Sequence, residues 1–238
     1  YYDGDKNSTH SVDGYFVSPK KFDGNDHEEH RISMTYGGHV ETCQGANTFA
    51  VPGIYQILNL IVERYAWLPL DKLVEFPIKT AKEGFKLTQP TKDYFIQSLE
   101  PMFMWHEQSK IALTNVYEDL ENGIVKLDKL ADTLSHMSDE GFNDFYIGDI
   151  SKSIVETLKI EGGHATQDDF NGYDLIEENK FEYKYKNLKL TGHSGPSIGG
   201  LMVLKYLNAF AVESQNIEET LNNVYLDRQN KSECFCDR

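Results

Sequence analysis

The sequence predicts an α+β fold in which helices predominate, and three observations lead to this prediction. Residues 1–50 combine short strand-like segments with loops, residues 51–176 repeat apolar side chains mainly at helix spacing, and residues 177–238 begin with a strand-like run that helical segments follow. The chain has 238 residues, 39% of them hydrophobic and 26% charged, which is ordinary for a globular protein with a sizeable core. We therefore expect residues 1–238 to form one domain with these three successive parts.

The first part is expected to contain two short strands. Residues 1–50 are rich in Gly, His, Asp and Ser and show little periodicity. The turn-like residues 3–7 separate two strand candidates within Tyr1–Val17. Val51-Pro-Gly53 then marks the beginning of the helical part, because proline and glycine punctuate the chain between elements.

The helical part begins with two well-marked helices. The first is predicted from a single apolar stripe that consists of Ile54, Ile57, Leu58, Ile61, Val62 and Tyr65. The second is predicted over residues 70–83, with Gly84 as its stop. Pro77 lies inside the second helix and is expected to kink it or to split it in two.

Further helices are predicted around residues 91–99 and from residues 127–137. Residues 143–161 carry the longest helical pattern of the chain, which glycines end. Thr166 is then expected to cap a short helix, because a threonine before acidic first-turn residues suits a helix N-terminus.

The last part is expected to begin with one strand over residues 180–191. A helix over residues 197–212 and another over residues 217–225 follow it. The chain is therefore rich in helix, with strands at its start and near residue 185.

The charge balance excludes one class of partner. The chain carries 38 acidic and 23 basic residues, for a net charge of −15. A nucleic-acid partner requires a basic face, and no cluster of Lys and Arg supplies one here. No apolar run approaches the roughly 18 residues that would span a bilayer, so we expect no membrane span. The first residues lack the apolar core of a signal peptide, which leaves the compartment open.

The cysteines do not define a site. Cys43, Cys234 and Cys236 are three in number, so they cannot all pair within the chain. No C-x-x-C pattern is present for zinc or redox chemistry. The state of these three thiols stays open.

Residues 195–199, Gly-Pro-Ser-Ile-Gly, match the G-x-S-x-G pattern of a strand-to-helix elbow that exposes a nucleophilic serine. A hydrolase of that class needs an acid and then a histidine after the serine in chain order. The last histidine is His193, which precedes Ser197, and no alternating βαβ run leads up to the pattern. We therefore interpret this stretch as a turn into a helix.

The segment His27-Glu-Glu-His30 resembles a zinc motif, but its histidines are three residues apart, whereas H-E-x-x-H places them four apart. The segment lies in a polar stretch, which favours a solvated loop. We expect no metal site.

Eight motifs in order resemble one known family. They are Val51-Pro-Gly53, Tyr65-Ala-Trp-Leu-Pro-Leu70, Pro77-Ile-Lys-Thr-Ala-Lys-Glu-Gly-Phe85, Leu130-Ala-Asp-Thr-Leu134, Gly141-Phe-Asn-Asp-Phe-Tyr-Ile-Gly148, Gly162-Gly163 with Thr166-Gln-Asp-Asp-Phe-Asn-Gly-Tyr173, Pro196-Ser-Ile-Gly-Gly200 and Val224-Tyr-Leu-Asp-Arg228. Their order and spacing are similar to those of the large subunit of the gamma-glutamyltransferases, also called gamma-glutamyltranspeptidases.

The resemblance implies the N-terminal nucleophile hydrolase fold, a four-layer αββα sandwich, of which residues 1–238 would be the helix-rich large-subunit part. Members of this family cleave themselves into two subunits, and the new N-terminal threonine of the small subunit is the nucleophile. It attacks the γ-glutamyl amide of glutathione or a similar compound, and water or an amino acid or peptide then accepts the acyl group. The resemblance implies no cofactor, and a small subunit from the same precursor as partner.

The nucleophile is expected to lie outside this chain. Thr9 stands in a segment superficially similar to the family's processing sequence, but the residues after it follow the large subunit at the right distance. We therefore expect no catalytic residue within residues 1–238, and the chain by itself is expected to be inactive.

One substrate-binding position differs from the family pattern. The segment aligned with residues 13–19 reads D-x-R-E-x-A-P in the family, whose arginine holds the α-carboxylate of the substrate. Here Tyr15 stands at the arginine position and Phe16 at the adjacent acid. Tyrosine offers one neutral hydrogen bond where arginine offers two charged ones. A related acylase with an altered substrate and a non-catalytic binding homologue are therefore alternatives to a γ-glutamyl enzyme, and both residues can instead be ordinary strand residues.

Overall fold

The computed structural model describes residues 1–20, 30–34, 40–95, 97, 100–118, 123–177, 180–193 and 198–211. Its contacts divide the chain into two compact units. Unit 1 consists of residues 1–15 together with the chain from residue 174 onward, and unit 2 consists of Phe16–Tyr173.

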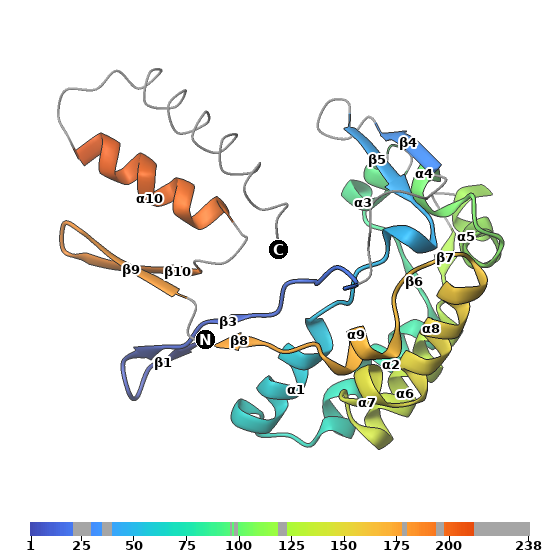
Figure 1. Cartoon of the computed structure of the whole chain (residues 1–238), viewed down its shortest axis with the longest axis horizontal. Helices are drawn as coiled ribbons and strands as arrows, with labels where there is room; N and C mark the ends of the chain where they lie inside the picture. Colours follow the sequence, from blue (N-terminus) through green and yellow to red (C-terminus); the bar gives the residue numbers. More distant parts are fainter. Residues whose placement is uncertain are drawn as a thin grey trace. The chain divides into compact units, whose positions relative to one another are not determined.

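Unit 2 is mainly helical (Figure 1). Helix α2 lies along α6, and the short helix α7 packs against both α8 and α9. The helices are α1 (Ile54–Tyr65), α2 (Leu70–Glu83), α3 (Gln89–Tyr94), α4 (Glu100–Phe103), α5 (Glu107–Glu118), α6 (Asp128–Glu140), α7 (Asp144–Ile147), α8 (Asp149–Ile160) and α9 (Gln167–Asn171), with a 3-10 turn, η1, at Ala46–Thr48. The predicted helices over residues 54–65 and 70–83 are confirmed.

Two short antiparallel ladders accompany these helices. Strand β4 (His30–Met34) pairs with β5 (Val40–Gln44), and β6 (Phe85–Lys86) pairs with β7 (Ile124–Val125). Val17 and Val51 exchange backbone hydrogen bonds of 3.0 and 2.9 Å. This bridge fixes the start of unit 2 beside the residues that lead into α1.

The core of unit 2 is aromatic. The Phe170 ring is fully buried and lies 5.7 Å from the Phe49 ring and 5.8 Å from the Phe145 ring, measured between centroids. The hydroxyl of Tyr146 donates to the carbonyl of Pro52 at 2.6 Å and accepts the amide of Gln56 at 3.2 Å. Burial raises the pKa of Tyr146, so the phenol stays neutral and can make both bonds. These contacts attach the start of α1 to α7 and α9.

Helix α2 runs unbroken through Pro77, so the expected split at this residue is wrong. Its inner face buries Val74 and Ala81, and the helix packs along α6. This packing holds the helix together although proline cannot donate to the carbonyl one turn earlier.

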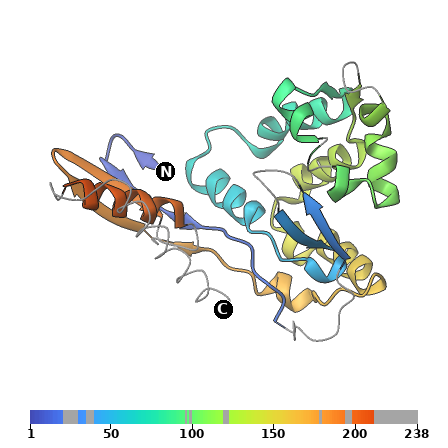
Figure 2. The same cartoon turned by 90° about the horizontal axis from the view of Figure 1, so that it is seen from above.

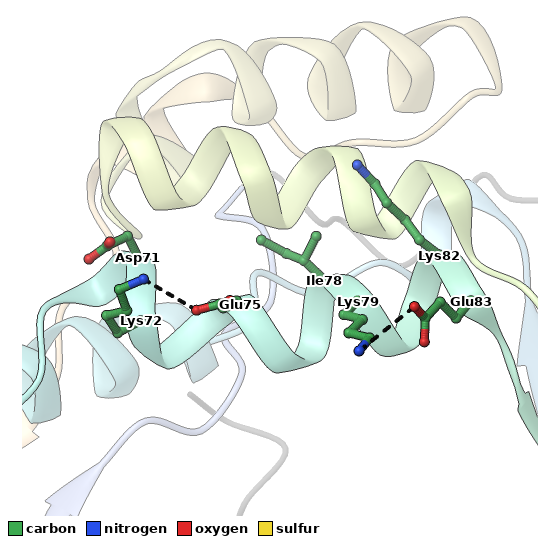
Figure 3. Close-up of a pocket in the computed structure, with 7 residues that line it drawn as sticks. All are labelled: Asp71, Lys72, Glu75, Ile78, Lys79, Lys82 and Glu83. Carbon is green, nitrogen blue, oxygen red and sulfur yellow. Dashed lines mark hydrogen bonds and ion pairs between the residues drawn. The ribbon is translucent and has the colours of Figure 1, made fainter.

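The outer face of α2 carries a shallow hollow that is lined entirely by this one helix (Figure 3). Four of its charged side chains form two pairs along the helix, Lys72 with Glu75 at 3.4 Å and Lys79 with Glu83 at 3.9 Å. Exposed pairs of this kind stabilise a helix only slightly. A hollow that one helix lines cannot enclose a ligand, and we assign it no function.

The single helix predicted over residues 143–161 is wrong, because the chain breaks at Gly148. This residue has φ −104° and ψ −153°, which ends α7 and begins α8. The Asp144 side chain occupies the space beside it, so that a Cβ on Gly148 would overlap the Asp144 carboxylate. Asp144 also contacts Nε2 of His136 at 3.0 Å. The Asp144 carboxylate therefore fills the corner between α7 and α8. Apolar spacing alone predicts one continuous helix there.

Unit 1 is built from both ends of its sequence. Strand β1 (Tyr2–Asp3) pairs with β2 (Ser8–Thr9), which confirms the two strands predicted around the turn at residues 3–7. Strand β3 (Val12–Asp13) pairs antiparallel with β8 (Ile176–Glu177), far along the chain. The β3–β8 ladder thus joins the N-terminal segment to the chain that leaves unit 2.

The strand predicted over residues 180–191 is wrong in one respect, because the segment forms a hairpin of two strands. Strand β9 (Lys180–Tyr185) turns at Lys186, whose φ is 55°, and returns as β10 (Leu188–His193). Helix α10 (Ile198–Ala211) packs against β10 (Figure 2). The helix predicted over residues 217–225 lies outside the described residues. No helix in the described ranges is both long and apolar enough to cross a membrane.

Asp169 connects the two ends of unit 2. Its Oδ1 accepts the amide of Lys20 at 2.9 Å, and its Oδ2 accepts the amide and hydroxyl of Thr166 at 2.8 and 2.7 Å. This confirms Thr166 as the N-terminal cap of a short helix. Burial opposes ionisation of Asp169, but these hydrogen bonds outweigh it and lower the pKa of the carboxyl below its usual value of 3.8.

Replacing Asp169 with asparagine is expected to lower the free energy of unfolding at pH 7 by about 1.5–3 kcal/mol, the range for hydrogen bonds to a charged group. Because the folded-state pKa is depressed, the ionised carboxyl stabilises the fold above its unfolded-state pKa, and this stabilisation is lost as the pH falls through the folded value. Urea unfolding from pH 3 to pH 7 measures the difference, which should shrink below about pH 4. Asp168→Asn, at the exposed neighbour, is the control, and an equal effect there would contradict the assignment.

Candidate functional site

The predicted substrate-binding residue, Tyr15, lies just beyond the end of β3. Asp13, the last residue of β3, is 8% exposed, and its Oδ1 accepts the amide of Tyr15 at 2.9 Å. A carboxylate that binds the amide two residues later forms a tight local turn. This turn sets the direction in which the chain leaves the strand, and the Tyr15 side chain is 48% exposed there.

The second oxygen of Asp13 faces a histidine from the other end of unit 1. Oδ2 of Asp13 lies 3.4 Å from Nε2 of His193, the last residue of β10. The other ring nitrogen of His193, Nδ1, lies 3.1 Å from the hydroxyl of Ser11. Ser11 and Asp13 are two residues apart, so one imidazole bridges two side chains that project from the same side of the extended segment.

The charges near this imidazole have opposite signs. Lys180 stands directly opposite His193 in the β9–β10 ladder. Its Nζ donates to the carbonyl of Thr9 at 2.6 Å. Two residues of the hairpin therefore hold the segment from Thr9 to Asp13: Lys180 binds the Thr9 carbonyl, and His193 contacts the Ser11 hydroxyl and the Asp13 carboxylate.

Sequence reasoning selected Tyr15 but missed Ser11 and His193. From the sequence, His193 was identified only as the last histidine of the chain, which precedes Ser197, and Ser197 itself lies outside the described residues. Ser11 and His193 are 182 residues apart in sequence, and only the β3–β8 ladder and the β9–β10 hairpin bring them together. An unaligned single sequence carries no signal for that pairing.

The remaining candidates form no site in the described part of the chain. His30 is the first residue of β4, while His27 lies outside the described residues. Within the described ranges, no group of three or more His, Cys, Asp or Glu side chains is arranged to hold a metal ion. Cys43 lies in β5 as a free, half-buried thiol, and Cys234 and Cys236 lie outside the described residues. Thr9 lies in β2.

Comparison with known proteins gives the family. The family model described as gamma-glutamyltranspeptidase matches residues 1–230. The chain belongs to the gamma-glutamyltranspeptidase family. This confirms the resemblance that the eight motifs predicted.

Individual relatives agree with this family. The glutathione hydrolase proenzyme of Escherichia coli is 27% identical over 158 residues, which cover 66% of this chain and 27% of that protein. The solved gamma-glutamyltranspeptidase of Pseudomonas nitroreducens, in complex with L-DON, matches with a TM-score of 0.74 and 21% identity, over 96% of this chain and 70% of the solved chain. The cephalosporin acylase of Bacillus halodurans matches with a TM-score of 0.62 and 18% identity, over 84% and 37%.

These likenesses confirm the predicted fold class. The gamma-glutamyltranspeptidases and the acylase share the N-terminal nucleophile hydrolase fold, and this chain has it too. The chain spans about 30% of the length of the curated glutathione hydrolases that it matches.

Proposed function

We propose that this chain is the large-subunit portion of an enzyme that cleaves γ-glutamyl amides such as glutathione. The observation that carries the proposal is the family match over residues 1–230, supported by the structural likeness over 96% of the chain. The nucleophile is an N-terminal threonine of a small subunit outside residues 1–238, made by cleavage of a common precursor. The acyl group passes from that threonine to water, an amino acid or a peptide.

The chemistry divides between the two subunits. The small subunit supplies the threonine hydroxyl, and its own α-amine acts as the general base. Backbone donors stabilise the oxyanion of the tetrahedral intermediate. This chain supplies the residue that meets the substrate's α-carboxylate, for which Tyr15 is the candidate. No metal or organic cofactor takes part.

The composition of α10 supports a partner that covers this helix. Its sequence is apolar on all sides, with Lys205 as its one charged residue. Helices of this kind are normally buried all round. Helix α10 packs against β10, yet Val203 is 55% exposed. A further layer of protein from the small subunit would cover such side chains.

A related acylase is the second candidate, and the residue at position 15 favours it. A tyrosine hydroxyl gives the α-carboxylate one neutral hydrogen bond, so γ-glutamyl substrates bind more weakly than they would to arginine. An acyl donor without an α-carboxylate loses nothing by this change. The structural likeness to a cephalosporin acylase agrees with this second candidate.

The test uses the full-length precursor from the parent gene. We expect it to cleave into two subunits and to hydrolyse γ-glutamyl p-nitroanilide, and we expect replacement of the new N-terminal threonine by alanine to abolish both. Thr9→Ala is the matched control: its backbone carbonyl still accepts Lys180, so cleavage and activity should stay within about twofold of the parent, the scatter of a surface substitution.

Two outcomes decide between the candidates. Faster hydrolysis of butyryl p-nitroanilide than of γ-glutamyl p-nitroanilide would replace the γ-glutamyl enzyme by the acylase, because the butyryl group is the γ-glutamyl group without its α-amine and α-carboxylate. If the protein cleaves itself but hydrolyses neither anilide, the enzymatic proposal would be wrong, and the non-catalytic binding homologue would be the remaining alternative.

A further inference from the structure

The two oxygens of the Asp13 carboxylate make different contacts. Oδ1 holds the amide of Tyr15 at 2.9 Å, and Oδ2 faces Nε2 of His193 at 3.4 Å. The two oxygens share one plane, so a contact that fixes Oδ2 also fixes where Oδ1 points. The orientation of His193 is thereby coupled to the backbone at Tyr15.

The hydroxyl of Ser11 contacts the other side of the ring. It lies 3.1 Å from Nδ1 of His193, and which of the two atoms donates depends on the tautomer of the ring. Nε2 of the same ring lies 3.4 Å from Oδ2 of Asp13. Ser11 and Asp13 therefore contact the two ring nitrogens from one extended segment, and together they fix the orientation of the imidazole.

We propose that His193, held in orientation by Ser11, is a positioning residue that fixes the Asp13 carboxylate and through it the backbone of Tyr15. The array of hydroxyl, imidazole and carboxylate would thus set the affinity of the site for the α-carboxylate of the acyl donor. This last step rests on the role given to Tyr15 under the proposed function. The expected effect of His193 on the backbone at Tyr15 does not depend on that role.

The first experiment follows hydrogen exchange of the Tyr15 amide, as a protection factor corrected for intrinsic rates, in the full-length protein. We expect His193→Phe, which keeps a ring without donors, to lower the protection about tenfold, the effect of losing the one hydrogen bond from the Tyr15 amide to Asp13. Ser11→Ala removes the contact to Nδ1 of His193 and should lower the protection by a smaller factor.

The neighbouring residues offer matched controls. His10, whose Nε2 lies 3.3 Å from the Ser8 hydroxyl, belongs to the same segment, and His10→Phe should leave Tyr15 protected. Asp13→Asn should rescue what Asp13→Ala loses, because the amide oxygen still accepts Tyr15 and the amide nitrogen can donate to the other tautomer of His193. This pair keeps the test valid even if the phenylalanine variant folds poorly.

The second experiment measures kinetics of the cleaved full-length protein with γ-glutamyl p-nitroanilide. His193→Phe should raise KM about tenfold with kcat within twofold, the signature of lost binding common to ground state and transition state. Unchanged Tyr15 protection in both His193→Phe and Ser11→Ala would overturn the positioning role. Lost protection with unchanged KM would retain it and overturn the role of Tyr15 at the carboxylate. Labelling of Ser11 by a fluorophosphonate, mapped by peptide sequencing, would show a nucleophile and overturn the proposal.

Discussion

Replacing Tyr15 with arginine is expected to raise kcat/KM for γ-glutamyl p-nitroanilide by about 10- to 100-fold, mainly through a lower KM. The guanidinium can meet a carboxylate with two parallel charge-assisted hydrogen bonds, where the phenol makes one neutral bond. Bonds to a charged group are worth about 1.5–3 kcal/mol, and each 1.36 kcal/mol is a factor of ten in rate. Because Tyr15 is about half exposed at a strand end, the longer side chain has room there.

Three variants control this result. Tyr15→Lys supplies charge without the fork and should gain less than arginine. Tyr15→Phe removes the phenol and should lose the single hydrogen bond. Phe16→Arg places the same guanidinium one residue further on, so a gain there would show that added charge, and no specific position, raises affinity. If Tyr15→Arg binds glutamyl substrates no better than the parent, Tyr15 does not lie at the carboxylate site.

Replacing Phe170 with alanine is expected to lower the free energy of unfolding by about 3–5 kcal/mol, the cost of emptying a buried aromatic site. Phe170 is 0% exposed, and its ring packs between those of Phe49 and Phe145. The cavity would open where α9, α7 and the residues before α1 meet. Chemical denaturation of the full-length protein in urea measures the loss.

Phe76 provides the matched control for this core substitution. It lies on the outer side of α2 and is 76% exposed, so Phe76→Ala removes the same atoms from solvent-exposed surface. Its effect should stay within about 0.5 kcal/mol. A comparable loss at both positions would mean that the aromatic cluster around Phe170 is not the core of unit 2.

Local patterns in the sequence predict much of unit 2. The spacing of apolar residues predicts helix α1, and Gly84 predicts the end of α2. The buried side chain of α1 is nevertheless Leu60, outside the predicted stripe, whereas Ile54 and Ile61 of the stripe are exposed. Helix α5 was not predicted. The break at Gly148 was not predicted, because it depends on the position of the Asp144 side chain, and the spacing of apolar residues carries no information about that side chain.

Only part of the candidate site can be predicted from the sequence. Tyr15 stands in a motif that a family pattern locates, and Asp13 belongs to the same motif. His193 and Ser11 have no such pattern, and their contact exists only because two strand pairings bring distant segments together. The hairpin of β9 and β10 was read as one strand because Lys186 and Asn187 interrupt the alternation only briefly.

The hydrogen bond from Lys20 to Asp169 has a consequence for the order in which the chain folds. The β3–β8 ladder joins Asp13 to Ile176, and closing a flexible loop of about 160 residues costs about 4–5 kcal/mol in chain entropy. A ladder of two residues on each side cannot offset that cost by itself. Once unit 2 has folded, however, Lys20 and Asp169 lie together, and the loop that remains is a dozen or so residues. Unit 2 therefore acts as a template, and the strand that presents Tyr15 is among the last elements to form.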